Sequence, residues 1–317
     1  MAQITSSEKA FIGVDIGKEE FFAFSVSLGS SPAFTNNQVG FEQFIEWLSP
    51  LPENTLIAFE ATGGYEWALW QYLSEKEYTA RQISPIHVRA YARAHGHIAK
   101  NDYIDARTIA GFIAFRPDAG RNIPSEKLFH IKALVQKRSQ LVEHKKRLKC
   151  QIDHEFSDKF KTMNETMMTM LEQHIKEINA FLESAIKEDE ALERQAEILR
   201  SIPGIGPVLC ATLLAHMPEL GHCSDKQIAA LAGVAPMDRQ SGAYQGRKTI
   251  FGGRKEVRTV LYQAALVASI HNPVLNEFAK KLQEKNKPHK VKLIAIARKL
   301  ITIANAMVAK NTLWKYA

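Results

Sequence analysis

The sequence predicts an α/β domain at the N-terminus and mainly α-helical structure in the rest of the chain. Residues 1–120 alternate short apolar runs, typical of strands, with segments of helical spacing. The stretch from 125 to about 199 contains no glycine and keeps a helical repeat throughout. We therefore expect three domains: an α/β domain over 1–120, a long helical coiled-coil linker over 121–197 and a mainly α domain over 198–317.

Composition narrows the class of protein. The chain has 317 residues, 45% apolar and 24% charged, which is typical of globular proteins with real hydrophobic cores. The most apolar stretch, 293–308, contains Arg298 and Lys299, and the first residues lack the pattern of a signal peptide. Three cysteines without a CxxC pair argue against a disulfide framework or a Cys-rich zinc site. We expect a soluble, cytoplasmic protein with no membrane contact.

Charge is distributed unevenly between the two parts of the chain. Residues 1–120 carry 9 basic and 14 acidic side chains, whereas residues 121–317 carry 32 basic and 20 acidic ones, a net charge of +12. A basic body of this kind is typical of proteins that bind a polyanion. The alternative, a basic surface that is merely solvated, remains open on charge alone.

The first 120 residues follow a recognisable order of elements. Expected strands are 10–16, 20–27, 32–35, 55–60 and 80–84, and expected helices are 41–48, 65–75, 88–95 and 103–115. Three strands, a helix and then alternating strands and helices is the order of an RNase H-like domain.

Four acidic residues of this domain lie at the ends of predicted strands or on one face of a predicted helix. Asp15 and Glu60 each end an apolar strand, and the i, i+3 spacing of Asp102 and Asp105 places both on one helical face. Carboxylates that converge repel one another unless cations bind them, and their hard oxygens suit Mg²⁺. A pair of such ions about 3.5–4 Å apart clamps the attacking and leaving oxygens of a phosphodiester. For either aspartate alone, the alternative is that Asp102 caps the helix and Asp105 lies in its acid-rich first turn.

Two long helices are expected between 125 and 199, with a break near 157–164. The first carries a basic run with a single acid, Glu143, inside it. Its members that we take as candidate nucleic-acid contacts are Lys137, Arg138, Lys145, Lys146 and Arg147. A solvated helix face explains the same run equally well.

The segment IPGIGP, residues 202–207, precedes an apolar helix over 208–216. Gly204 and Gly206 in such a turn expose backbone N–H groups at a helix N-terminus, where a phosphate binds readily. The segment resembles a helix-hairpin-helix element. An ordinary tight turn between helices is the alternative.

A polar, glycine-rich segment over 235–261 surrounds Ser241 with cations. These are Arg239, Arg247, Lys248, Arg254, Lys255 and Arg258. Positive charge near a serine stabilises the charge that develops when it attacks a phosphodiester. No GxSxG motif and no nearby histidine support a hydrolase triad. From the residues alone, Ser241 is either a nucleophile or one of the many serines that form turns.

The motifs GVDIGK (13–18), FEATGGYE (59–66) and KNDYIDAR (100–107) closely resemble the acidic motifs of the DEDD transposases. This family of insertion-sequence recombinases includes the Piv-type DNA invertases and the bridge-RNA-guided recombinases. The run from RQSG through QGRKTIFGGRKEVRTVLY to KLIAIARKLI resembles the C-terminal transposase domain of the same family. The resemblance implies a RuvC-like N-terminal domain, Asp15, Glu60, Asp102 and Asp105 as the metal-binding quartet, and Ser241 as a nucleophile that forms a phosphoserine link to DNA.

The resemblance also implies the function and the partners. It identifies the chain as a site-specific DNA recombinase or transposase that uses Mg²⁺, donor and target DNA and a structured noncoding guide RNA. It implies a homodimer, a tetramer in the synaptic complex, and association with the nucleoid when DNA is bound. No P-loop is visible, as expected for transesterification without ATP. One alternative is a RuvC-like Holliday junction endonuclease in which water attacks and Ser241 is idle. A nucleic-acid-binding protein without catalysis is another, and the intact set of four acids argues against it.

Overall fold

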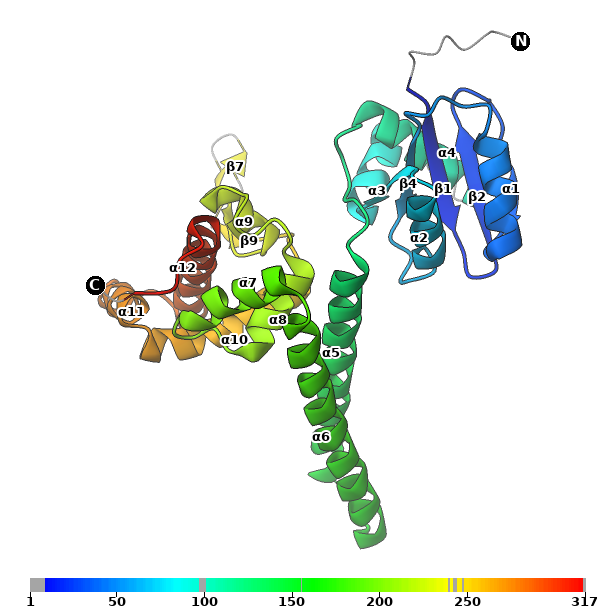
Figure 1. The fold of residues 1–317 in the computed structure, drawn as a ribbon. Coiled ribbons are helices and arrows are strands. Elements are labelled where there is room, and N and C mark those ends of the chain that lie inside the picture. The colour runs from blue at the N-terminus through cyan, green and yellow to red at the C-terminus, as the bar shows by residue number, and fades with distance from the viewer. Residues whose placement is uncertain are drawn as a thin grey trace. The chain divides into compact units, whose positions relative to one another are not determined.

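The computed structural model describes residues 9–96, 101–154, 156–238, 240–241, 244–246 and 248–315. The chain forms two compact units that divide between Pro124 and Ser125 (Figure 1). The elements of the N-terminal unit are β1 (Phe11–Ile16), β2 (Glu20–Ser25), β3 (Ala33–Thr35), α1 (Gln38–Leu48), β4 (Leu56–Glu60), α2 (Trp67–Glu75), β5 (Thr79–Ile83), α3 (Pro85–Ala94) and α4 (Asp102–Phe115). Each expected strand and helix of this region is present, with ends shifted by a few residues.

The five strands form one mixed sheet in the order β3-β2-β1-β4-β5. β1 is antiparallel to β2 and parallel to β4, and β4 is parallel to β5. The α/β character of the N-terminal region is therefore confirmed, and the strand order is consistent with the expected RNase H-like and RuvC-like arrangement.

Helices cover both faces of this sheet, because its central strands carry apolar side chains on both sides. Ile12, Val14 and Ile16 of β1 belong to a cluster with α1 and α2 that is rich in aromatic rings, including Phe21. On the opposite face, residues of β4 and β5 pack with Val88 of α3 and with α4. The acidic ends of β1 and β4 emerge on this second face.

β1 and α4 approach each other closely at Gly13. A Cβ atom placed on Gly13 would lie 2.1 Å from the carbonyl oxygen of Ala106 and 2.2 Å from the nitrogen of Ala110. Ala106 and Ala110 are themselves fully buried. Small residues on both elements thus let the backbone of α4 lie directly on β1.

A buried carboxylate holds the loop that follows β4. Glu66, which is 7% exposed, accepts hydrogen bonds from the Thr62 hydroxyl and the Gly64 N–H, each at 2.9 Å. Its other oxygen accepts a bond of 2.6 Å from the Gln82 side chain, whose own oxygen accepts from Arg121. The loop of residues 61–65 is wrapped around this carboxylate, directly after Glu60.

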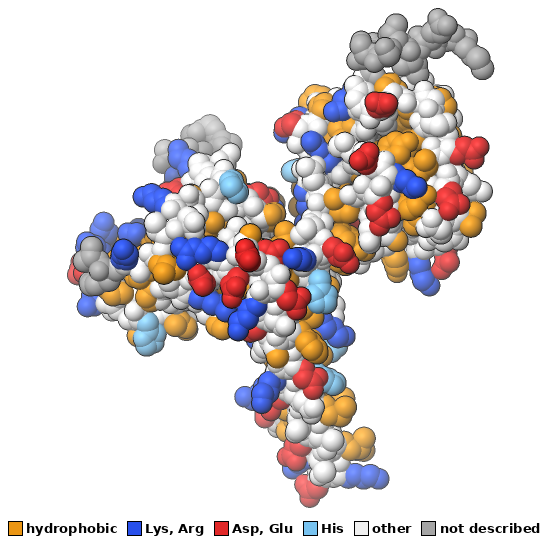
Figure 2. All heavy atoms as spheres, viewed as in Figure 1, with side chains coloured by type: hydrophobic (Ala, Val, Ile, Leu, Met, Phe, Trp, Pro, Cys, Tyr) orange, Lys and Arg blue, Asp and Glu red, His pale blue; other side chains and the backbone are white. Residues whose placement is uncertain are grey.

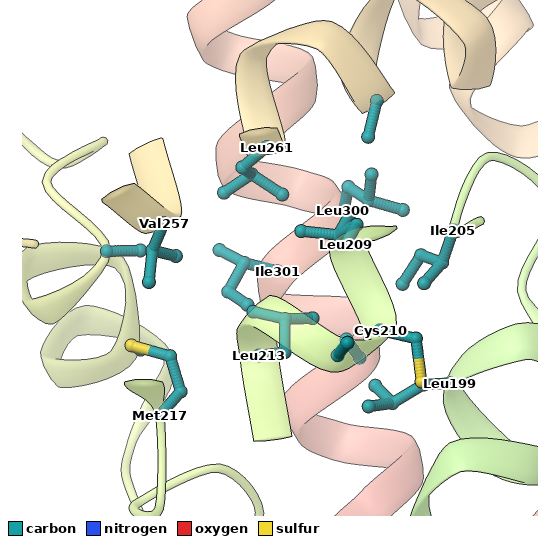
Figure 3. Packing of buried hydrophobic residues seen from close by; sticks show 14 of the residues in the cluster. Leu199, Ile205, Leu209, Cys210, Leu213, Met217, Val257, Leu261, Leu300 and Ile301 are labelled. Carbon is teal, nitrogen blue, oxygen red and sulfur yellow. The ribbon is translucent and has the colours of Figure 1, made fainter. Parts of the chain in front are cut away.

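The C-terminal unit is almost entirely helical. Its helices are α5 (Glu126–Ile152), α6 (Asp158–Lys187), α7 (Glu190–Ser201), α8 (Pro207–His216), α9 (Asp225–Leu231), α10 (Lys255–His271), α11 (Pro273–Glu284) and α12 (His289–Lys310). Four two-residue strands, β6 (Pro236–Met237), β7 (Gln240–Ser241), β8 (Tyr244–Gln245) and β9 (Thr249–Ile250), lie between α9 and α10. Figure 3 shows Leu209 and Leu213 of α8 among apolar side chains of α10 and α12.

The long helices α5 and α6 pack antiparallel. Arg138 donates to Asn179 and Lys145 pairs with Glu172, so seven residues forward in α5 correspond to seven residues back in α6. The break comes earlier than expected, since α5 ends at Ile152 and α6 already includes residues 158–164. The sequence analysis also missed the end of α6 at Lys187, which is followed by an Asp189 cap that accepts from two N–H groups of α7.

The inner ends of α5 and α6 belong to the core of the C-terminal unit. Ile131 and Val135 of α5 and Ile178 and Leu182 of α6 share one hydrophobic cluster with α8, α10 and α12. Leu148, nearer the outer end of α5, is not in that cluster. The linker, coiled-coil and helix-hairpin-helix assignments stay predictions. No helix in the described part of the chain combines the length and the apolar character needed to cross a bilayer.

Replacing Gly13 with alanine is expected to lower the free energy of unfolding by about 2–3 kcal/mol, because the added methyl group meets backbone atoms of α4 that cannot rotate away. Urea denaturation measures the change. Gly111→Ala is the matched control on α4, since the atom nearest to its added Cβ is the Tyr91 hydroxyl at 2.9 Å, at the end of a side chain that can shift. Equal stability of the two variants would contradict the direct backbone contact.

Replacing Glu66 with glutamine is expected to cost about 1–3 kcal/mol of unfolding free energy. The glutamine side chain carries an NH₂ group in place of one carboxylate oxygen. All the neighbours of that carboxylate donate hydrogen bonds, so at least one buried donor would lose its acceptor and face another donor. Glu75→Gln, an exposed residue at the end of α2, provides the control and should leave the urea midpoint unchanged. A stable Glu66→Gln variant would show that the network does not hold the loop.

Candidate active site and nucleic-acid interface

The ends of two neighbouring parallel strands bring Asp15 and Glu60 together. Val14 of β1 pairs with Phe59 of β4, so Asp15 and Glu60 are the next residues along the two strands. Asp15 points to the same face as Gly13, two residues before it, because side chains alternate along a strand. Both acids thus lie on the face that α4 covers, and both are half-buried.

Asp102 and Asp105 lie in the first turn of α4. The N-cap of this helix is Asn101, whose side chain accepts a 2.8 Å hydrogen bond from the Ile104 N–H, so the alternative that Asp102 is the cap is wrong. Tyr103 packs edge-on against Phe22 of β2, with ring centroids 4.7 Å apart. This contact and the Gly13 contact fix the first turn of α4 above the sheet.

The four acids line one cavity of about 700 Å³. We call Asp15, Glu60, Asp102 and Asp105 the acidic quartet. The walls of the cavity come from the ends of β1 and β4, the loop after β4, and helices α3 and α4. Asp102 is exposed, and the other three acids are half-buried. The structure thus gathers every sequence-predicted acid of the quartet around the same space.

The donor set of this cavity suits a hard divalent cation, because carboxylate oxygens are the ligands that such ions prefer. Among the residues that the structure describes, no group of three or more His, Cys, Asp or Glu side chains stands in metal-ligating geometry. The quartet therefore fits a cation by its chemistry and by its shared cavity, and closer approach of its oxygens is required for ligation.

Two arginines of α3, Arg89 and Arg93, line the same cavity and were missed by the sequence analysis. Their i, i+4 spacing places them on one face of α3, and this spacing directly after β5 was the available signal. Glu66 was missed as well. It was part of the quoted FEATGGYE motif, but burial of its carboxylate depends on Gln82 and Arg121, which are distant in sequence.

Ser241 lies in β7, where it pairs with Tyr244 of β8. The neighbouring strands β6 and β9 also pair. The Gly-Gly-Arg run that follows them has a packing role. Gly253 has φ +67, and a Cβ atom on it would lie 2.3 Å from Gly233. The next residue, Arg254, forms a bidentate ion pair with Glu219 at 2.7 and 2.5 Å.

The cations predicted around Ser241 have varied surroundings. Arg239 and Arg247 lie outside the described residues. Lys248 pairs with Asp238 at 2.8 Å, and Arg258 donates to the Gly252 carbonyl at 2.5 Å. Lys255 lines a second cavity, described below. The ion pair of Arg254 with Glu219 anchors the start of α10.

The second cavity, of about 830 Å³, lies beside the IPGIGP turn and is also lined by Arg138, Lys255, Gly204 and Gly206. Gly204 has φ +102, and an added Cβ would lie 2.4 Å from the Cβ of Ala268, so this glycine permits close packing on α10. Gly206 is the N-cap of α8 and has open space where a Cβ would be. Burial lowers the pKa of the Arg138 guanidinium, which nonetheless stays protonated.

The remaining cations of the α5 run differ in their partners. Lys145 pairs with Glu172 at 2.7 Å and Arg147 with Glu143 at 3.3 Å. Neither Lys137 nor Lys146 forms an ion pair with a described residue. Figure 2 shows several groups of Lys and Arg side chains over the helices of the C-terminal unit.

A cysteine nucleophile receives no support from the C-terminal core. Burial raises the pKa of the Cys210 thiol to about 11, so the thiol stays protonated at neutral pH. Cys210 packs as an apolar side chain in the cluster of Figure 3.

Comparison with known proteins identifies the family. Residues 12–161 match the sequence model of the IS110-type DEDD transposases, described as a transposase, and residues 196–280 match the model described as Transposase IS116/IS110/IS902 family. The pilin gene-inverting proteins of Moraxella bovis and Moraxella lacunata are each 29% identical over 319 residues, which cover 96% of this chain and 97% of theirs. The 44.8 kDa protein of insertion element IS116 from Streptomyces clavuligerus is 28% identical over 148 residues, 45% of this chain and 36% of that protein.

The two matched regions contain the acidic quartet and the serine segment, respectively. The family implies DNA as the substrate and the use of a divalent metal. The chain belongs to the IS116/IS110/IS902 family of DEDD transposases and is a DNA transposase or recombinase.

Proposed function

We propose that this protein is a site-specific recombinase that cuts and rejoins DNA by transesterification through a phosphoserine intermediate. The observation that carries the proposal is the single cavity lined by all four acids of the quartet. Three elements, β1, β4 and α4, supply these acids from distant parts of the sequence. Four carboxylates around one space repel one another, and bound divalent cations would relieve that repulsion.

In the proposed reaction, Ser241 is the nucleophile. Its Oγ attacks the phosphorus of the scissile phosphodiester and loses its proton, an Oγ–P bond forms, and the DNA oxygen leaves as a hydroxyl. The hydroxyl of the new DNA partner then attacks the phosphoserine, and Ser241 regains its proton. Mg²⁺ held by Asp15, Glu60, Asp102 and Asp105, when bound, would polarise the phosphate and stabilise its developing charge. The number of phosphodiester bonds is conserved, so ATP is not consumed.

Several finer features belong to the same proposal. The pilin gene-inverting relatives, which align with 96% of this chain, support action on two DNA sites that exchange strands. We further propose a structured noncoding bridge RNA that pairs with donor and target DNA.

Assembly as a dimer, and as a tetramer in the synaptic complex, supplies one serine and one quartet for each exchanged strand. Residues 121–197 act as the helical linker between the domains over 1–120 and 198–317, and the protein acts on DNA in the bacterial cytoplasm.

The contacts to nucleic acid are proposed in two places. One is the α5 run, in which Lys137 and Lys146 have no acidic partner among the described residues. The other is the cavity beside Gly206, where the N-terminus of α8 faces the cations Arg138 and Lys255. Backbone N–H groups at a helix N-terminus and nearby cations together bind phosphate oxygens.

A RuvC-like junction endonuclease is the second candidate. It uses the same quartet, with water in place of Ser241 as the nucleophile. Such an enzyme leaves free DNA ends and never becomes covalently attached to DNA.

A trapping experiment separates the two candidates. Full-length protein, junction DNA of its element, the transcribed flanking RNA and Mg²⁺ are expected to give a DNA–protein adduct on a denaturing gel. Ser241→Ala removes the attacking oxygen and Asp102→Asn removes one metal ligand, so each is expected to lower adduct formation by at least about 1,000-fold. Omission of Mg²⁺ or of the RNA should have the same effect.

Two variants control for general damage in this experiment. Ser184→Ala on α6 and Asp118→Asn after α4 change exposed residues outside both cavities and should give the adduct at the normal rate. Cleavage that persists in Ser241→Ala without any adduct would overturn the recombinase mechanism and favour the endonuclease.

The double variant Lys137→Gln/Lys146→Gln is expected to bind DNA more weakly. Each lost phosphate contact lowers the slope of log K against log salt by about 0.9, so the double variant should lose about 2. The loss should be equal for junction and unrelated DNA, since phosphates carry no sequence information. Lys176→Gln, an exposed lysine of α6, provides the control. An unchanged slope would remove α5 from the DNA interface.

A further inference from the structure

We propose that Arg89 and Arg93 of α3 bind the DNA phosphate that enters the cavity of the acidic quartet and stabilise it during strand transfer. The inference rests on the proposed function, because it assigns the phosphate-binding wall of the same site. Both arginines line the cavity and come from α3, whereas the four acids come from β1, β4 and α4.

Neither guanidinium holds the fold through a polar contact with the described residues. In the described part of the chain, Arg89 and Arg93 take part in no ion pair or hydrogen bond, and both side chains are exposed. Other arginines of this unit are engaged: Arg81 donates to the Pro117 carbonyl, Arg116 pairs with Asp118, and Arg121 donates to Gln82. No hydrogen bond or ion pair within the described residues thus occupies the donors of these two cavity-lining arginines.

Apolar contacts of α3 fix the position of the pair. Val88 is buried among residues of β4, β5 and α4. Tyr91 lies against Phe112, with ring centroids 5.8 Å apart, and its hydroxyl is the atom nearest to where a Cβ on Gly111 would sit. These contacts orient α3, so the arginines at positions 89 and 93 face the cavity without ordering a loop.

Two like charges at i, i+4 repel and destabilise an isolated helix. Arg93 lies in the last turn, where the helix dipole favours a cation, but Arg89 has no such compensation. A bound anion between the two guanidiniums removes the repulsion. The stability of α3 alone therefore does not account for the pair; the charges that can offset it are the acidic quartet and an anion that enters the same cavity.

The charge balance of the reaction identifies that ligand as a phosphodiester. Divalent cations offset the charge of the carboxylates, but the phosphate itself gains negative charge as it passes from four to five oxygen neighbours. Guanidinium groups donate paired N–H bonds in the plane that suits two phosphate oxygens. Preorganised donors of this kind stabilise the transition state more than the ground state.

The test measures binding without chemistry, in the Ser241→Ala background of the full chain. The probe is a fluorescein-labelled duplex of the element's junction, with the flanking RNA transcript, and anisotropy gives the affinity across a salt series. Arg89→Gln and Arg93→Gln are each expected to weaken binding about tenfold and to lower the salt slope by about 0.9. Arg89→Lys and Arg93→Lys should recover part of the loss, because lysine keeps the charge but not the paired donors.

A second measurement locates the contact. Replacing single phosphates around the junction with neutral methylphosphonates should weaken binding of the protein with both arginines at one position, and the arginine variants should be insensitive at that position. Arg116→Gln, an exposed arginine outside the cavity, is the matched control and should behave like the parent. Arginine variants that bind like Arg116→Gln, or that stay sensitive at every position, would overturn the proposal.

The adduct assay keeps this result separate from the proposed function. Absence of an adduct with the natural serine would refute the phosphoserine mechanism whatever the arginine variants do. An adduct that forms normally in Arg89→Gln and Arg93→Gln at saturating DNA would overturn the role of the arginines alone. Melting temperatures equal to the parent establish that the variants are folded.

Discussion

The architecture of the acidic site depends on how closely one helix can approach one strand. Gly13 of β1 meets the backbone of α4 at Ala106 and Ala110, with no space for a side chain between them. Asp15 lies two residues beyond Gly13, Asp105 lies directly before Ala106 and Asp102 about one turn before it. This contact therefore sets the separation of acids that are about 90 residues apart in the sequence. Any wider spacing of helix and sheet would part the acids on the strands from those on the helix.

Holding four carboxylates around one space opposes their mutual repulsion, and the surrounding fold supplies the restraint. The register of β1 and β4 places Asp15 beside Glu60, and the Asn101 cap begins α4 immediately before Asp102. The loop after Glu60 closes on the Glu66 carboxylate, and Asn36 donates to the carbonyls of Gly17 and Tyr65, which follow the two acidic strands. These restraints are made by residues outside the acidic quartet, and each keeps an element of the site in place.

The sequence allowed most elements of the N-terminal unit and its four acids to be predicted, because alternating apolar residues and strand-end acids are local signals. It did not reveal the cap at Asp189, since a polar cap between two helical patterns interrupts neither. The burial of Glu66 and the position of Arg89 and Arg93 at the cavity were not predicted, because the hydrogen-bond partners of Glu66 and the other residues that line the cavity come from distant segments of the sequence. Arg254 was assigned to nucleic acid on its charge, and only the fold reveals Glu219 opposite it. The chemistry of Ser241 rests on the family and the proposed experiments.

The hairpin of α5 and α6 is secured unevenly along its length, and this has a consequence for local unfolding. Its inner ends share the core of the C-terminal unit, whereas the outer ends rely on each other and leave Phe160, Met163 and Met167 exposed. Backbone amide hydrogens of the inner ends should therefore exchange with solvent only when the whole unit unfolds. Those of the outer ends should exchange through local openings of low free energy. The outer end of the hairpin can thus open locally while its inner end stays as rigid as the core of the C-terminal unit.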